Sequence, residues 1–306
     1  MDLRQLNAVA AVAEHGSFSA AARALHTVQS NVSTHVARIE AELGVTLIDR
    51  ATGLPTEQGE AVVARARRIH AELDALEFDV ASLADEVRGA VRVGIIGTTG
   101  RWLLPPLLEA MAAQHPGIHV VAIDATTTSL LPQVATGTLD LAVVNLPVDE
   151  AELAVEPLFD EDRILIAPAD HPLATNERVG IAELSEHPLL LEPVGTGFRD
   201  LLDQEAARAG VALQTKAEVD GMRLLASLAV TGFGAAVVPA TALPFTTSDE
   251  WTQVPLDGIP HRSVGLVHRR RGLPSAPARA LRAALVDVVA AHADAQGGIR
   301  PTAAAN

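Results

Sequence analysis

Small polar side chains follow several apolar, strand-like segments of the 306-residue sequence. Hydroxyl groups and free backbone N–H groups at helix starts can bind a small anion such as a carboxylate. In an α/β fold these groups meet in a crevice at the carboxyl ends of the strands. We therefore predict one ligand cleft, with Arg101 or Arg199 as its counter-charge, formed by Thr98, Thr99, Gly100, Thr127, Thr128, Asn145, Thr196, Gly197 and Phe198. The alternative is that the hydroxyl groups only cap helices.

A second polar group lies on one face of a helix predicted near the N-terminus. Its apolar residues recur at steps of 4, 4, 3 and 4 from Val28 to Leu43, which is helical spacing. The face opposite this stripe is polar and nearly uncharged, and it carries Ser30, Ser33, Thr34, Ala37 and Arg38, with Gln29 at its flank. Such side chains can reach base edges in a DNA major groove, where glutamine suits adenine and arginine suits guanine or phosphate. A plain solvated helix face is the alternative.

This helix belongs to a predicted helix-turn-helix over about Phe18 to Ala37. An alanine-rich segment at 20–25 favours helix, and a short break at 26–27 separates it from the polar-faced helix, which ends at Gly44. The polar turn at 51–56 predicts a wing, and Thr56 is suited to cap the next helix. The candidate DNA-binding residues are Ser17, Ser19, Gln29, Ser30, Ser33, Thr34, Arg38, Arg50 and Thr52.

The negative net charge of the chain argues against a general electrostatic attraction to nucleic acid. The whole chain has 23 basic and 38 acidic residues, a formal net charge of −15. Residues 1–60 hold four arginines against seven acidic residues. Binding must therefore rely on locally placed arginines, hydroxyl groups and helix N-termini, with weak non-specific affinity and a modest dependence on salt.

A long heptad pattern follows this domain. Apolar residues from Val62 to Val87 alternate steps of 4 and 3, with no glycine until Gly89. This pattern is typical of a two-chain coiled coil, which would present two DNA-reading helices together, whereas a helix packed on its own domain is the alternative. The predicted dimerisation residues are Ile69, Leu73, Leu76, Val80 and Leu83.

From Val91 onward, strand-like and helical segments alternate, which is typical of an α/β domain with parallel sheets. A break near 166–170 predicts a second lobe, and a return near 264–268 would close the first. The predicted organisation is a DNA-binding domain at 1–60, a linker helix at 61–88, an effector domain at 91–296 and a frayed tail at 297–306. Within the effector domain, lobe I takes about 91–165 and 266–296, and lobe II takes about 166–265.

The N-terminal region resembles the winged helix-turn-helix of LysR-type transcription regulators. The residues that carry this resemblance are Leu3, Leu6, Gly16, Ser17, Phe18, Ser19, Ala21, Ala22, Leu25, Gln29, Ser33, Ile39, Glu40, Leu43, Gly44, Leu47, Ile48, Arg50, Thr56, Gly59 and Glu60. Residues 91–270 are similar to the family's effector-binding domain. One departure is that the polar-faced helix starts Val28-Gln29-Ser30, where the family often has Ser-Gln-Pro. This departure bears on the operator sequence and not on the fold.

The resemblance implies an all-α winged helix-turn-helix, a long linker helix and a two-lobed α/β domain like periplasmic solute-binding proteins. It implies contacts from Thr98 and Thr127 to a small effector, with Asn145, Thr196 and Phe198 nearby. The expected function is DNA-binding transcription regulation under a small, anionic effector. The expected partners are operator DNA and further copies of the chain, as a homodimer or a dimer of dimers.

Other patterns exclude competing functions. The sequence has no cysteine, which excludes disulfides and thiolate chemistry. It shows no signal peptide and no membrane-length apolar run, so we expect a cytoplasmic protein without membrane contact. The segment 94–100 has GxxGxxG rather than dinucleotide spacing, and we expect no cofactor or metal.

Two charged runs of the sequence lie outside the candidate sites. The acidic run 160–162 is expected to be a solvated corner, and the basic run 268–271 to be solvated or a dimer contact rather than a DNA contact. The sequence shows no nucleophile elbow and no positioned carboxylate pair, so it gives little support to an enzyme. Two rival classes remain: a solute-binding module without gene control, and an α/β enzyme with an appended DNA-binding domain.

Overall fold

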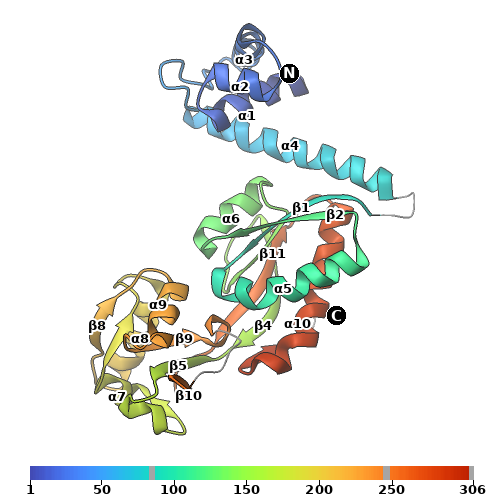
Figure 1. Cartoon of the computed structure of the whole chain (residues 1–306). Coiled ribbons are helices and arrows are strands. Elements are labelled where there is room, and N and C mark those ends of the chain that lie inside the picture. Colours follow the sequence, from blue (N-terminus) through green and yellow to red (C-terminus); the bar gives the residue numbers. More distant parts are fainter. Residues whose placement is uncertain (83–86, 244–248, 303–306) are drawn as a thin grey trace.

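The computed structural model describes residues 1–82, 87–243 and 249–302. A small helical domain at the N-terminus is followed by a long helix, α4, and then by a two-lobed α/β domain (Figure 1). This is the fold class that the sequence predicts. None of the helices within the described ranges is both long and apolar enough to cross a bilayer.

The N-terminal domain packs α1 (Leu3–His15), α2 (Phe18–Ala24) and α3 (Gln29–Leu43) around one apolar core. Residues at the helix ends explain the boundaries. Ser17 Oγ accepts a hydrogen bond from the backbone N–H of Ala20 at 3.2 Å and so caps α2. Gly16 and Gly44, at φ of 69° and 71°, end α1 and α3 in the left-handed conformation that favours glycine.

The predicted wing is a tight loop closed by one antiparallel bridge between Ile48 and Pro55. Inside it, the N–H of Asp49 donates to the carbonyl of Leu54 at 2.9 Å. Gly53 lies very close to the turn between α1 and α2. A Cβ at Gly53 would lie 2.1 Å from the carbonyl oxygen of Gly16. The wing is therefore anchored against the helix-turn-helix.

The linker helix α4 (Glu57–Ser82) starts four residues before the predicted linker at 61–88, and Thr56 Oγ1 caps it, as expected, by accepting from the N–H of Gly59 at 3.0 Å. Its first turns differ from the predicted seam. Val63 and Ala66 are buried in the core of the N-terminal domain, and Val62 packs against them. The start of the helix therefore serves its own domain, and only the later seam positions face outward.

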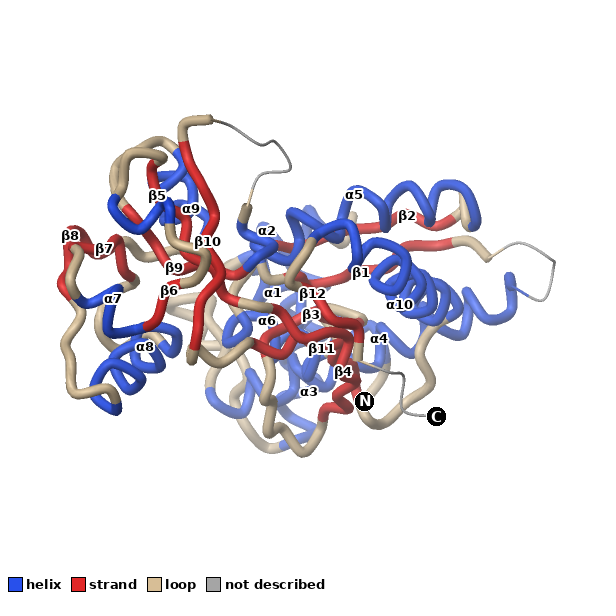
Figure 2. Tube along the Cα trace, turned by 90° about the horizontal axis from the view of Figure 1, so that it is seen from below, coloured by secondary structure: helices blue, strands red, loops and turns tan. Residues whose placement is uncertain are grey.

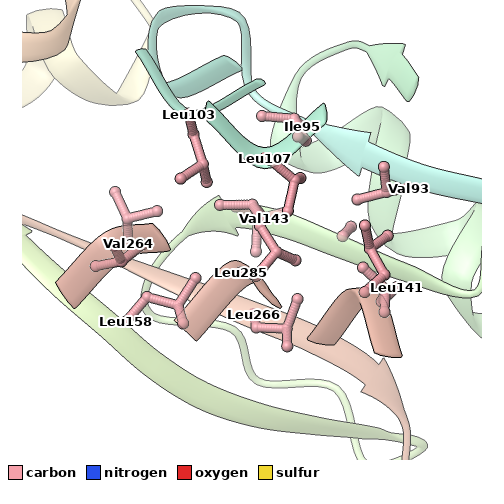
Figure 3. Packing of buried hydrophobic residues seen from close by; sticks show 14 of the residues in the cluster. Val93, Ile95, Leu103, Leu107, Leu141, Val143, Leu158, Val264, Leu266 and Leu285 are labelled. Atoms are coloured by element: carbon pink, nitrogen blue, oxygen red, sulfur yellow. The ribbon is translucent and has the colours of Figure 1, made fainter. Parts of the chain in front are cut away.

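Lobe I is one six-stranded sheet in the order β12-β4-β11-β3-β1-β2. Its core lies between the sheet and the helices α5 and α10, where Leu103, Leu107 and Leu285 meet strand residues such as Val93 and Val143 (Figure 3). Its elements are β1 (Gly89–Ile95), α5 (Gly97–Gln114), β2 (Ile118–Asp124), α6 (Thr127–Thr136), β3 (Leu141–Asn145), β4 (Leu153–Glu161), β11 (Arg262–Arg269), α10 (Ala276–Gln296) and β12 (Ile299–Pro301).

Lobe II is a second six-stranded sheet, in the order β6-β10-β5-β9-β7-β8, with an apolar cluster on each face. Figure 2 shows its strands gathered apart from those of lobe I. Its elements are β5 (Arg163–Pro168), η1 (Pro172–Thr175), β6 (Val179–Gly180), α7 (Ile181–Ser185), β7 (Pro188–Leu191), α8 (Gly197–Arg208), β8 (Gln214–Glu218), α9 (Met222–Val230), β9 (Ala235–Pro239), η2 (Ala240–Ala242) and β10 (Trp251–Asp257).

Three details differ from the prediction. Both sheets are mixed rather than parallel, because β4, β5 and β11 run antiparallel to their neighbours. The chain crosses between the lobes at 162 and 258–261, a few residues earlier than predicted at each crossing. Part of the predicted frayed tail is ordered, since β12 pairs with β4, whereas residues 303–306 lie outside the described ranges.

Candidate DNA interface and ligand cleft

The predicted DNA-reading face of α3 is open to solvent. Gln29, Ser30, Thr34 and Arg38 are exposed, and Ser33 is half-buried beside the apolar stripe. Ser19 Oγ donates to Gln29 Oε1 at 3.3 Å, which links the start of α2 to the start of α3. The hydroxyl of Thr34 donates to its own helix, to the carbonyl of Ser30 at 2.8 Å. The face therefore keeps Gln29 and Arg38 as the long side chains that can reach outward.

The flanking candidates hold the local structure as well as lying at the surface. Arg50 lies 3.6 Å from the carboxylate of Glu40 and 5.6 Å from the centre of the Phe18 ring, yet its side chain is 58% exposed. Thr52 Oγ1 accepts from the N–H of Leu54 at 3.2 Å inside the wing. Arg50 and Thr52 thus sit on the wing side of the polar-faced helix, available to a phosphate backbone.

Between the lobes, one arginine gathers the polar groups of the ligand cleft. Arg262, the first residue of β11, is the register partner of Glu161, the last residue of β4. Its Nε donates to Glu161 Oε2 at 2.6 Å, and the Glu161 side chain is fully buried. The backbone N–H of Thr241 also donates to Glu161, at 2.5 Å. The buried carboxylate is therefore both paired and hydrogen-bonded, as burial of a charge requires.

The same guanidinium contacts the predicted hydroxyl set. Arg262 Nη2 donates to Thr98 Oγ1 at 2.9 Å and lies 3.4 Å from Thr99 Oγ1, while Nη1 donates to Asn145 Oδ1 at 3.3 Å. Thr127 Oγ1 accepts from the N–H of Asn145 at 3.1 Å, so it joins the same group. The structure thus brings Thr98, Thr99, Thr127 and Asn145 together.

Thr128 and Gly100 lie apart from this group. The hydroxyl of Thr128 shares a hydrogen bond with Thr126 at 3.1 Å. Gly100 instead lines a hollow of about 400 Å³ that also includes Arg101 and, from lobe II, Arg223. Arg223 forms an ion pair with Asp124 at the end of β2, so this hollow is bridged between the lobes.

On the lobe II side, the predicted residues surround two ionisable groups. The Arg163 guanidinium lies 4.8 Å from the centre of the Phe198 ring. Burial lowers the pKa of Arg163 to about 10, the charge of Arg262 acts in the same direction, and Glu161 opposes them. Thr196 Oγ1 lies 3.5 Å from the carboxylate of Glu192. Gly197 begins α8 beside them.

The two candidate counter-charges differ in their surroundings. Arg199 is buried and bonded to Asp203 at 2.9 Å and to Glu218 at 3.2 Å, so acids of lobe II already neutralise it. Arg101 is exposed and reaches the carbonyl of Ala242 at 3.5 Å. Neither arginine belongs to the cluster of polar side chains around Arg262.

Sequence reasoning missed Arg262, Glu161, Thr241 and Arg163. The prediction of a solvated acidic corner at 160–162 is wrong for Glu161, whose side chain is fully buried against Arg262. A signal was present, because an arginine begins β11 and a glutamate ends β4, next to runs of apolar residues. Their pairing depends on strand register across 101 residues, which periodicity does not reveal.

The predicted dimer seam is partly open. Ile69 is 37% exposed and Leu76 is 59% exposed, while Leu73 is half-buried. The side chain of Val80 and the whole of Leu83 lie outside the described part of the structure. An apolar ridge at 69–76 is therefore available to a partner.

Both the N-terminal region and the two-lobed domain match models of known protein families. Residues 3–60 match the model of the bacterial regulatory helix-turn-helix protein, lysR family, and residues 84–290 match the LysR substrate binding domain. A probable hydrogen peroxide-inducible genes activator of Streptomyces viridosporus is 35% identical, over 92% of this chain and 93% of that protein. The Escherichia coli DNA-binding transcriptional dual regulator OxyR is 31% identical, over 96% of each. A full-length cysteine-to-aspartate variant of OxyR from Pseudomonas aeruginosa has a TM-score of 0.74 at 26% identity, covering 94% of each chain.

Proposed function

Since the chain belongs to the LysR family of bacterial transcription regulators, we propose how it reads DNA and what controls it. The chain is a DNA-binding regulator with an effector-binding domain, and not an enzyme. We infer that α3 reads the operator through Gln29 and Arg38, with Arg50 and Thr52 on the phosphates. Two copies joined through α4 would supply two such helices, as a homodimer or a dimer of dimers in the cytoplasm.

The proposed effector is a small organic anion held between the lobes. The observation that supports this is Arg262, which reaches Thr98, Thr99 and Asn145 while it is paired with Glu161. Because Glu161 already pairs with Arg262, the counter-charge for an incoming carboxylate would come from Arg163 nearby, while Arg262 offers hydrogen bonds. Binding would then change how the lobes are held together and, through α4, how the paired DNA-binding domains are spaced.

Relatives are named for induction by hydrogen peroxide, which offers a second candidate signal. Peroxide oxidises a cysteine reversibly through its thiolate. The 306 residues contain no cysteine. We therefore propose that this chain receives its signal by binding a ligand and not by thiol oxidation.

The test is footprinting on the DNA upstream of the chain's own gene and its divergent neighbour, with and without a series of organic acids and with hydrogen peroxide. Wild type should protect a site, and Gln29→Ala should lose about 1–3 kcal/mol of discrimination between operator and mismatched sequence. The matched control is Gln253→Ala, an exposed glutamine in lobe II. Equal footprints from all three proteins would contradict the proposed reading helix.

The effector arm uses the same assay. Thr98→Ala should weaken the response to the active organic acid while leaving the effector-free footprint unchanged, because Thr98 contacts Arg262 and is remote from α3 in the sequence. A response to peroxide and to no organic acid would overturn the anion proposal, and loss of all DNA binding in Thr98→Ala would indicate a folding defect.

A further inference from the structure

A second cavity lies away from the ligand cleft, where the linker helix α4 meets lobe I. It has a volume of about 520 Å³, and we call it the arginine hollow. Arg65 and Arg68 of α4 line one side, and Arg269, Arg270 and Arg271 at the end of β11 line the other. Five of the 23 basic residues of a chain with net charge −15 are thus gathered around one cavity.

The acidic residues of the hollow do not neutralise this charge. Its two carboxylates are Glu72 and Glu152, which leaves an excess of three positive charges over the lining. Arg68 Nη2 pairs with Glu152 at 2.6 Å, and its Nε donates to the carbonyl of Ala135 at 2.9 Å. Arg270 donates to the carbonyl of Leu153 at 3.0 Å. Two of the five arginines are therefore held in place.

The other three arginines keep donors to spare. Arg269 Nη1 is buried and has no hydrogen-bond partner among the described residues. A buried N–H group without an acceptor is unfavourable and rare in native proteins. Arg65 and Arg271 are exposed at the rim of the hollow. An acceptor with several oxygens could bind the two exposed guanidinium groups at the rim, while the charge of Arg269, whose Nη1 is buried, adds to the attraction.

Two glycines show that the hollow is closely fitted. At Gly137, which ends α6, a Cβ would lie 2.5 Å from Arg269 Nη1 and 3.7 Å from the Cβ of Ala71 on α4. At Gly272, which has a φ of +95°, a Cβ would lie 2.7 Å from Glu72 Oε1. Both positions let lobe I approach the linker helix closely, so the arginines are placed by packing and do not merely extend into solvent.

We propose that the arginine hollow is a second regulatory site that binds a small oxyanion with two or more negative charges. Guanidinium groups bind both phosphate and paired carboxylates, so the ligand is a phosphate-bearing or polycarboxylate metabolite. Because its donors come from α4 on one side and β11 on the other, the bound oxyanion fixes the linker helix against lobe I. The site is separate from the ligand cleft and sets the position of the helix that carries the DNA-binding domain.

The test is isothermal titration of the full chain with inorganic pyrophosphate and, separately, with citrate, in buffers matched for ionic strength. Wild type should bind one of these probes saturably at one per chain, and which probe binds identifies phosphate or carboxylate as the chemistry. The double variant Arg65→Ala with Arg271→Ala should weaken binding at least tenfold. Arg67→Ala, on the same helix but outside the hollow, should bind as wild type.

Two more arms keep the proposal open to refutation. Thr98→Ala should bind the probe as wild type, because binding in the ligand cleft would instead be weakened by this change. Hydrogen exchange of the α4 amides at 65–72 should slow on addition of the probe in wild type and not in the double variant. Absence of saturable binding, equal binding by the double variant, or binding lost in Thr98→Ala would overturn the proposed site; unchanged exchange would overturn its hold on the linker helix.

Discussion

Glu192, beside the proposed ligand cleft, is a carboxyl group whose pKa is shifted by its surroundings. It follows β7, and burial raises its pKa above the ordinary value of 4.5. The charge of Asp220 raises the pKa further, while the hydrogen bond from Thr196 lowers it. A raised pKa in the folded chain means that folding favours the protonated form. Glu192 therefore makes its best contribution to stability at low pH and loses it as the pH rises above 4.5.

Replacing this carboxyl should make the effect visible. Glu192→Gln keeps the shape of the side chain and removes its charge, so the melting temperature of the variant relative to wild type should rise between pH 4 and pH 7. The measurement is thermal unfolding followed by circular dichroism across that range. Glu186→Gln, an exposed glutamate of the same lobe, is the matched control. Parallel curves for Glu192→Gln and wild type would contradict the raised pKa.

At the scale of elements, the start of α4 packs closely against the residues that lead into the wing. Thr56 Oγ1 donates to the carbonyl of Thr46 at 2.7 Å and accepts from the N–H of Gly59. A Cβ on Gly59 would lie 1.9 Å from the carbonyl oxygen of Leu47, closer than any real contact allows. The start of the linker helix is therefore closely packed against residues 46–47, which lead into the wing.

Gly59→Ala should break this close fit. The backbone must shift to admit the methyl group, which typically costs about 1–3 kcal/mol when a packed site is overfilled. Urea unfolding of the full chain measures the loss. Gly197→Ala, at the start of α8 where a Cβ meets nothing within 4 Å, should match wild type or exceed it slightly. Equal stability of the two variants would refute the close contact.

The elements that the sequence predicts best are those with clean periodicity. The helices α2 and α3 lie within a few residues of the predicted alanine-rich helix at 20–25 and of the predicted polar-faced helix that ends at Gly44. The strands β4 and β10 were missed, because Pro157 and Pro255 interrupt them and proline in a run argues against a strand. Pro157 lies at the register shift between β4 and β11, and proline is tolerated at such a bulge. The absence of these strands from the prediction hid antiparallel pairings in both sheets.

The residues of the candidate site also divide into those that the sequence could predict and those that it could not. Thr98, Thr127 and Asn145 could be predicted because they follow predicted strands, and the ends of parallel strands meet at one edge. Arg262 and Glu161 could not, because their contact requires the antiparallel register of β4 and β11. Local sequence patterns can thus predict side chains that lie at the end of one strand. Side chains that meet through long-range strand pairing can be identified only from the folded structure.

At the scale of the whole molecule, the free part of the α4 ridge decides assembly. The first seam residues are used by the DNA-binding domain, so a partner chain has residues from Ile69 onward to pack against. A coiled coil over this stretch would hold two copies of α3 in one particle, which is what operators with two half-sites require.

Leu73→Asp with Leu76→Asp should separate the copies. Placing two carboxylates in an apolar seam is unfavourable, so the double variant should sediment as a monomer and lose specific DNA binding at the same time. Leu224→Asp, on an exposed leucine of lobe II, is the control and should sediment as wild type does. A double variant that sediments like wild type would remove α4 from the interface.

The crossings between the lobes limit how the effector domain can move. They leave lobe I from adjacent strands, β4 and β11, whose end residues Glu161 and Arg262 are bonded to each other. Two connections that emerge side by side act as a single hinge axis, so the lobes can rotate about it but cannot slide apart. The Asp124–Arg223 pair lies at β2, three strands farther along the sheet and about 14 Å away at the usual strand spacing. The ion pair of Asp124 with Arg223 is therefore a second tie between the lobes, separate in space from the covalent crossings.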